Sequence, residues 1–198
     1  MRCRSSTGAV VQRPPEPCRR VAASVPVTPK RPPSAVIELP NDCEIVAARA
    51  LEAPIAVVLD AFTTRDRAEM AVSEGEDLTV YTNDLWVGGT WHHVSAGDDG
   101  TETSFHGTFL AVERPTRVSA TRLLDDWPEA EAVESIELNE TDGITMLTYR
   151  LAFRDPAARD TIPKEVSAQM MGDGFVRNIE SVAALLRSRV DPSGMVPG

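Results

Sequence analysis

A long amphipathic helix at the end of a strand-rich chain is the sequence feature that most limits the possible folds. Between Pro163 and Arg189, apolar residues recur every three or four positions, which is the spacing of a helix with one buried side. Pro163 lies near its start, and Asp191-Pro192 follows its end, where these residues favour helix initiation and termination. The apolar stripe consists of Met171, Phe175, Ile179, Val182 and Leu186. Such a helix needs an apolar surface to pack on.

The segment before this helix predicts a series of short strands that could provide that surface. A first strand is expected at 44–51, followed by two short helices at 54–63 and 65–72. Alternating apolar residues and turn signals such as Asp142-Gly143 predict further strands. These are expected at 77–81, 90–94, 103–112, 117–123, 133–138 and 145–153.

This order of elements predicts an α+β domain. We expect a curved antiparallel sheet of about six or seven strands wrapped around a long C-terminal helix, with the two short helices after the first strand. One helix cannot touch the whole concave face of a curved sheet. A cavity is therefore expected between helix and sheet, and a ligand would bind there.

The charge distribution divides the chain into segments. Residues 1–40 hold seven basic and two acidic residues together with eight prolines, whereas residues 41–198 hold 13 basic and 28 acidic residues. A proline-rich basic segment with so few apolar side chains cannot offset the entropy of ordering. We therefore expect a disordered tail at 1–40, a folded domain at 41–190 and a disordered C-terminus at 191–198.

Composition excludes several classes of function. A net charge of −10 argues against nucleic acid as a partner, because binding phosphates requires a basic surface. The sequence has no long apolar run that could insert into a membrane. Three cysteines without C-x-x-C spacing predict free thiols rather than a disulfide framework or a zinc site. The expected location is the cytoplasm.

A set of short motifs resembles a known family. They are Arg49-Ala50-Leu51-Glu52-Ala53-Pro54, Val58-Leu59-Asp60-Ala61-Phe62-Thr63, Gly88-Gly89-Thr90-Trp91, Asp99-Gly100-Thr101-Glu102, His106-Gly107-Thr108-Phe109, and the ending from Gly174-Phe175 to Leu185-Leu186. In order and spacing they resemble the C-terminal domain of the activator of heat-shock-protein-90 ATPase. That family belongs to the START-like (SRPBCC, Bet v-type) superfamily with the helix-grip fold. The resemblance covers residues 44–188.

The resemblance implies a fold but several different functions, since one fold hosts unrelated sites. Our first hypothesis is binding of a small, mostly apolar ligand in the cavity between the sheet and the C-terminal helix. The alternatives are a co-chaperone-like protein-interaction domain that stimulates a chaperone ATPase, and a cyclase- or hydratase-type enzyme using the same cavity. Arg67–Val72 and Phe175 stand where family members usually carry tryptophans, so the identity of the ligand cannot be transferred.

The candidate ligand-binding residues are apolar or aromatic side chains expected to face the cavity. They are Phe62, Met70, Trp86, Trp91, His93, Phe109, Tyr149, Met171 and Phe175. In a strand, Trp91 and His93 share one face, and we expect His93 to approach His106 across the hairpin. The sequence shows no nucleophile elbow, phosphate loop or set of three metal ligands. No catalytic residue, metal or cofactor is therefore predicted.

Two charged features are expected on the surface. Asp125, Asp126, Glu129, Glu131 and Glu134 lack the spacing and central glycine of a calcium loop, so they predict a solvated acidic loop. The tryptophan within it, Trp127, is a candidate lid over the cavity mouth. Arg150 interrupts an apolar strand and is expected to point outward.

Overall fold

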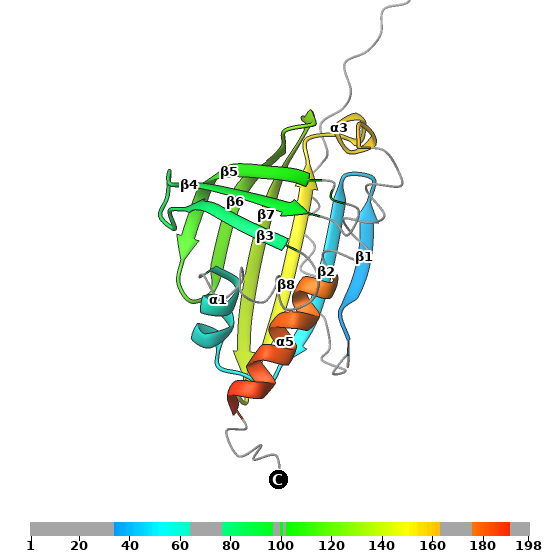
Figure 1. Cartoon of the computed structure of the whole chain (residues 1–198). Coiled ribbons are helices and arrows are strands. Elements are labelled where there is room, and N and C mark those ends of the chain that lie inside the picture. Colours follow the sequence, from blue (N-terminus) through cyan, green and yellow to red (C-terminus); the bar gives the residue numbers. More distant parts are fainter. Residues whose placement is uncertain (1–33, 64–76, 97–99, 101, 163–175, 191–198) are drawn as a thin grey trace, which may run out of the picture.

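Eight antiparallel strands in one sheet form the framework of the computed structural model (Figure 1), which describes residues 34–63, 77–96, 100, 102–162 and 176–190. The strands are β1 (Val36–Asn41), β2 (Glu44–Leu51), β3 (Asp77–Asn83), β4 (Thr90–Ala96), β5 (Glu102–Glu113), β6 (Arg117–Leu124), β7 (Trp127–Thr141) and β8 (Ile144–Phe153). The helices are α1 (Ile55–Thr63), α3 (Pro156–Asp160) and α5 (Val176–Val190). The predicted α+β class and curved antiparallel sheet are confirmed.

The sheet order is β1-β2-β8-β7-β6-β5-β4-β3. Successive strands from β3 to β8 are neighbours, whereas β2 pairs with β8 and so brings the start of the domain beside its end. The additional strand is β1, which pairs with β2 and lies partly in the segment predicted to be a tail. The residue just before β1 is tied to α5, because Ala35 N donates to Glu180 Oε1 at 2.8 Å.

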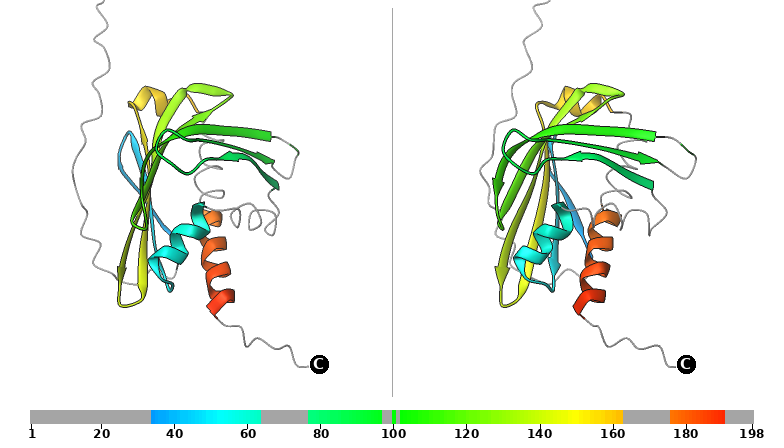
Figure 2. Two further views of the ribbon diagram at one scale, coloured as in Figure 1. Left: turned by 90° about the vertical axis from the view of Figure 1, so that its left-hand side faces the viewer. Right: turned by 60° about the vertical axis from the view of Figure 1, so that its left-hand side comes forward.

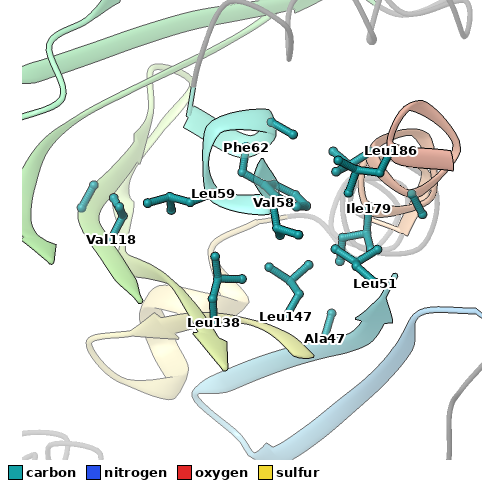
Figure 3. Packing of buried hydrophobic residues seen from close by; sticks show 14 of the residues in the cluster. Ala47, Leu51, Val58, Leu59, Phe62, Val118, Leu138, Leu147, Ile179 and Leu186 are labelled. Atoms are coloured by element: carbon teal, nitrogen blue, oxygen red, sulfur yellow. The ribbon is translucent and has the colours of Figure 1, made fainter. Parts of the chain in front are cut away.

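Both α1 and α5 lie on the concave side of the sheet, which we call the inner face (Figure 2). On β2 and β8 the inner face carries Ala47 and Leu147, both fully buried. Val58 of α1 and Ile179 of α5 pack against this surface (Figure 3). Hydrophobic burial between the helices and the middle of the sheet therefore holds the domain together.

The predicted helix positions are confirmed where the structure describes them. α1 occupies residues 55–63, against a prediction of 54–63, and buries Leu59 and Phe62. Of the expected long helix, α5 covers 176–190, and the predicted stripe residues Ile179, Val182 and Leu186 are buried. The expected helix at 65–72 and residues 163–175 lie outside the described part of the chain.

A second, smaller apolar cluster lies at the other end of the inner face. It joins Ile45, Ala132 and Phe153 of the sheet to Ala158 and to Ile162, which follows α3. Sequence periodicity did not predict α3, because five residues are too few to show a helical repeat. Pro156 at its first turn and Asp155 as N-cap are nevertheless ordinary helix-start residues.

The N-cap of α3 provides a pH-dependent test of this end of the domain. Asp155 accepts a hydrogen bond from Ala158 N at 2.8 Å, and this bond, with help from Arg154, lowers the pKa of Asp155 below its ordinary value. A carboxylate whose pKa is lowered by folding stabilises the folded state at pH values above the ordinary pKa. This stabilisation is lost as the pH falls through the lowered pKa. We expect Asp155→Asn to reduce the free energy of unfolding at pH 7, and the difference from wild type to shrink towards pH 2.

The measurement is urea unfolding at several pH values, with Asp160→Asn as the control. Asp160 is exposed at the end of the same helix. A loss with Asp155→Asn that stays constant from pH 7 to pH 2 would show that the cap acts without its charge.

Cysteine chemistry differs from the prediction at one position. Cys43 is buried and disulfide-bonded, so the expectation of free thiols is wrong for this residue. Among the described helices, none combines the length and apolar character needed to cross a membrane.

Candidate functional site

The inner face of β4 and β5 carries a group of buried aromatic side chains. Trp91 of β4 and Phe105 and Phe109 of β5 belong to the main apolar cluster. Trp91 faces Gly107 across the strand pair. A Cβ atom on Gly107 would lie 1.8 Å from Thr121 O and 2.7 Å from Trp91 Nε1. The missing side chain at Gly107 therefore makes the space in which the indole lies.

A local change in the ladder holds this indole in place. Trp91 Nε1 donates to Thr121 O at 3.2 Å. Thr108 N donates instead to the Thr121 side-chain hydroxyl, at 2.9 Å. The side chain of Thr121 thus replaces the carbonyl as the partner of β5, and the carbonyl is available to the tryptophan. All backbone groups involved are satisfied, as buried polar groups must be.

His93 extends this aromatic group. It is 8% exposed, and its ring centroid lies 5.0 Å from that of Trp91. The expected meeting of His93 and His106 is wrong. The register places His93 opposite Phe105, and His92 opposite His106, because the hairpin is shifted by one residue from the expected pairing and a shift of one exchanges the faces.

A charged network crosses the inner face beside the aromatic group. Arg122 of β6 donates to Glu134 Oε2 of β7 at 3.0 Å. The Tyr149 hydroxyl of β8 donates to the same oxygen at 2.8 Å. The guanidinium also lies 4.4 Å from the centre of the Phe105 ring, within the range of a cation–π contact. Three neighbouring strands thus converge on one carboxylate oxygen.

Burial and the neighbouring groups act in opposite directions on Arg122. Burial by itself lowers the pKa of Arg122, but Tyr149 and Glu134 outweigh it, so that the pKa is raised above its ordinary value. The arginine therefore stays charged at any physiological pH. The side chains of Arg122 and Glu134 are 17% and 18% exposed. The ion pair is largely desolvated but still accessible.

The sequence prediction missed Arg122 and placed Glu134 in a solvated acidic loop. The structure corrects this, since Glu134 lies in β7 on the inner face, between Ala132 and Ile136. A signal was present in both strands. Val118, Ala120 and Leu124 alternate in phase with Arg122, as Ala132, Ile136 and Leu138 do with Glu134. A charged residue at an apolar position on adjacent strands indicates a buried ion pair.

The remaining predicted site residues are distributed as follows. Phe62 is buried in the main cluster and Tyr149 belongs to the charged network. Trp86, by contrast, is 58% exposed in the loop after β3. Met70, Met171 and Phe175 lie outside the described residues. Trp127, the candidate lid, packs against both apolar clusters as the first residue of β7.

A second group of titratable residues lies on the opposite, outer face. His92 stacks on Tyr81 with ring centroids 4.9 Å apart, and its Nε2 lies 3.1 Å from Ser104 Oγ. His106 Nδ1 lies 2.9 Å from Asp125 Oδ1. A hydrogen bond from Ser104, followed by the influence of His106, lowers the pKa of Asp125. The side chains of His106 and Asp125 are 45% and 54% exposed, so this group is in contact with solvent.

Arg150 lies on this outer face as predicted, where it donates to Glu44 Oε2 at 2.8 Å. Within the described ranges, no group of three His, Cys, Asp or Glu side chains could hold a metal ion.

The inner face of β4–β8 is therefore the candidate site. It combines buried aromatic side chains with a pair of opposite charges that is still partly exposed.

Comparison with solved structures shows the same fold in several bacterial proteins. Protein Ms6760 from Mycobacterium smegmatis is 21% identical, and the match covers 79% of this chain and 99% of that protein with a TM-score of 0.65. A protein from Rhodobacter sphaeroides is 20% identical over 78% of this chain and 99% of its own, with a TM-score of 0.67. Protein CV1439 from Chromobacterium violaceum is 24% identical over 73% and 97%, with a TM-score of 0.61.

A search of curated proteins finds no match. The family model described as Activator of Hsp90 ATPase homolog 1-like protein matches residues 52–187. This range contains α1, the strands β3 to β8 and most of α5, and so includes every residue of the candidate site. The match confirms the resemblance inferred from the sequence motifs. The chain belongs to the Activator of Hsp90 ATPase homolog 1-like family.

Proposed function

We propose that this protein binds a small, mostly apolar molecule on the inner face of the sheet, in a cavity between the sheet and the C-terminal helix. The observation that supports this most directly is a group of buried aromatic side chains, Trp91, Phe105 and Phe109, beside an ion pair that is still partly exposed. Binding sites for small molecules combine apolar walls with a few polar groups in this way.

The free energy of binding requires both the aromatic side chains and the polar groups beside them. Burying about 300 Å² of apolar ligand surface contributes roughly 7 kcal/mol. Association and ordering oppose binding by about 4–15 kcal/mol. Apolar contact by itself therefore supports only weak binding. Polar contacts with Arg122, Glu134 or Tyr149 would supply the remaining affinity.

A neutral apolar dye tests the proposal. N-phenyl-1-naphthylamine fluoresces strongly on entering an apolar site and accepts excitation energy from a nearby tryptophan. We expect the wild-type protein to bind the dye and Trp91→Phe to bind it at least about threefold more weakly. The indole ring of tryptophan is larger than the phenyl ring and offers more apolar contact area. Titration of dye fluorescence, with circular dichroism to verify the fold, is the measurement.

Trp86→Phe is the matched control, since it makes the same change at an exposed position. The control should bind the dye like wild type. The proposal fails if the wild-type protein retains no dye, or if Trp86→Phe weakens binding while Trp91→Phe does not. Native mass spectrometry of protein purified from its own source would then identify any natural ligand.

A protein partner is the second candidate, and one surface favours it. Gly88 N donates to Phe109 O at 2.8 Å, so the backbone that follows the exposed Trp86 and Val87 lies beside the backbone that precedes the exposed Leu110. An exposed apolar group of this kind is suited to protein contact. The family description names activation of the Hsp90 ATPase, so a chaperone of that kind is the partner to test. Binding of a small molecule is expected to depend on Trp91, whereas binding of a protein partner is expected to depend on Trp86.

Catalysis of a cyclase or hydratase type on the same inner face is the third candidate. It would be favoured if His93→Ala kept ligand binding but abolished turnover. We also propose a cytoplasmic location for the protein.

A further inference from the structure

We infer that the molecule bound on the inner face is uncharged and carries a hydroxyl group that contacts both Arg122 and Glu134. This inference rests on the proposed function and specifies the chemistry of the ligand. It follows from the composition of the charged network and from its position beside the aromatic side chains.

The first step concerns charge. Arg122 and Glu134 form a pair of opposite charges 3.0 Å apart, so the network as a whole is neutral. A ligand carboxylate approaching Arg122 would lie against the carboxylate of Glu134, and an ammonium group approaching Glu134 would lie against the guanidinium. Like charges in a poorly solvated site repel strongly. The pair therefore selects against ions of either sign.

The second step concerns hydrogen bonding. A guanidinium can only donate, and an ionised carboxylate can only accept. Both side chains are partly exposed, and an entirely apolar ligand would cover these polar atoms and remove water from them. Covering a polar group without replacing its hydrogen bond is costly. A hydroxyl group accepts from Arg122 and donates to Glu134 at the same time, so it replaces the water on both.

The third step concerns what carries the hydroxyl. The Phe105 ring lies directly under the guanidinium, and Phe105 faces His93 on the next strand, beside Trp91. A molecule that places its hydroxyl at the ion pair would therefore have its apolar part beside these aromatic side chains, which are mostly buried. A flat aromatic ring in this part of the ligand would pack well against aromatic side chains.

Three probes of one shape test the inference. Naphthalene is apolar, 2-naphthol adds a neutral hydroxyl and 2-naphthoate adds a charged carboxylate. With the full-length protein we expect 2-naphthol to bind about tenfold more tightly than naphthalene, because it forms hydrogen bonds with the ion pair. We expect 2-naphthoate to bind no more tightly than naphthalene. Dissociation constants come from competition with N-phenyl-1-naphthylamine.

Glu134→Gln provides the decisive variant, since it removes the negative charge and keeps the shape. The charge of Arg122 is then uncompensated, and we expect the ranking to reverse so that 2-naphthoate binds more tightly than 2-naphthol. Glu44→Gln is the matched control. It removes the same charge from the cross-strand pair with Arg150 on the outer face, and it should leave the wild-type ranking unchanged.

The outcomes separate this inference from the proposed function. If none of the probes binds, both fail. If naphthalene binds as tightly as 2-naphthol, the site is an apolar one, and only the hydroxyl inference is overturned. Tightest binding of 2-naphthoate by the wild-type protein also overturns it. The wild-type ranking is decisive even if Glu134→Gln does not fold.

Discussion

Gly107→Ala is expected to lower the free energy of unfolding by about 2–4 kcal/mol. The added Cβ atom would lie 1.8 Å from Thr121 O and 2.7 Å from Trp91 Nε1. The first neighbour is backbone and cannot move without disturbing the pairing of β5 with β6. Overpacking of this kind costs roughly 1–3 kcal/mol. Loss of the hydrogen bond from Trp91 to Thr121 adds about 0.5–1.5 kcal/mol.

Urea unfolding followed by circular dichroism measures this loss, and tryptophan fluorescence shows whether the indole has moved. Gly143→Ala is the control. It lies in the turn between β7 and β8 with a φ of +76°, and a Cβ there meets nothing within 4 Å. Only backbone strain is expected, at about 1–2 kcal/mol. If both variants lose the same stability, the steric explanation for Gly107 is wrong.

Leu147→Ala is expected to be at least as damaging, with a loss of about 2–5 kcal/mol. Leu147 has no exposed surface and lies in β8, between Leu138 of β7 and Arg49 of β2. Val58 of α1 covers it on the inner face (Figure 3). Strands on both sides and a helix above restrict relaxation, so the cavity left by the shorter side chain stays open. The cost then includes the cavity as well as the lost burial.

Leu110→Ala is the matched control, because it makes the same change in a strand at a residue that is 47% exposed. We expect a loss of less than about 1 kcal/mol. Both values come from the midpoint and slope of urea unfolding. Similar losses for the two variants would show that the centre of the sheet is not the main source of stability.

The strand predictions succeeded where one face of a strand is apolar and the other polar. The alternation around Leu147 and Phe153 predicted 145–153, and β8 spans residues 144–153. Strand β1 was missed, because residues 1–40 as a whole have the proline-rich, basic composition of a disordered segment. Its order comes from pairing with β2 and from the contact of Ala35 with Glu180. These partners are distant in the sequence.

For the candidate site, the sequence indicated the aromatic part better than the polar part. Trp91, His93 and Phe109 were predicted to face the cavity, and the structure places all three on the inner face of the sheet. Trp86 has the same aromatic character but is exposed. Composition does not distinguish the two tryptophans. The difference depends on whether the backbone continues in a strand or turns into a loop.

Local pattern therefore determined which residues alternate within each strand, where α1 begins and ends, and to which family the chain belongs. Tertiary structure alone decided the register between strands, and with it the meeting of Arg122, Glu134 and Tyr149 at one oxygen atom. The physical reason is the two-residue repeat of a strand. It assigns side chains to one of two faces, but only the pairing of strands decides which charges become neighbours.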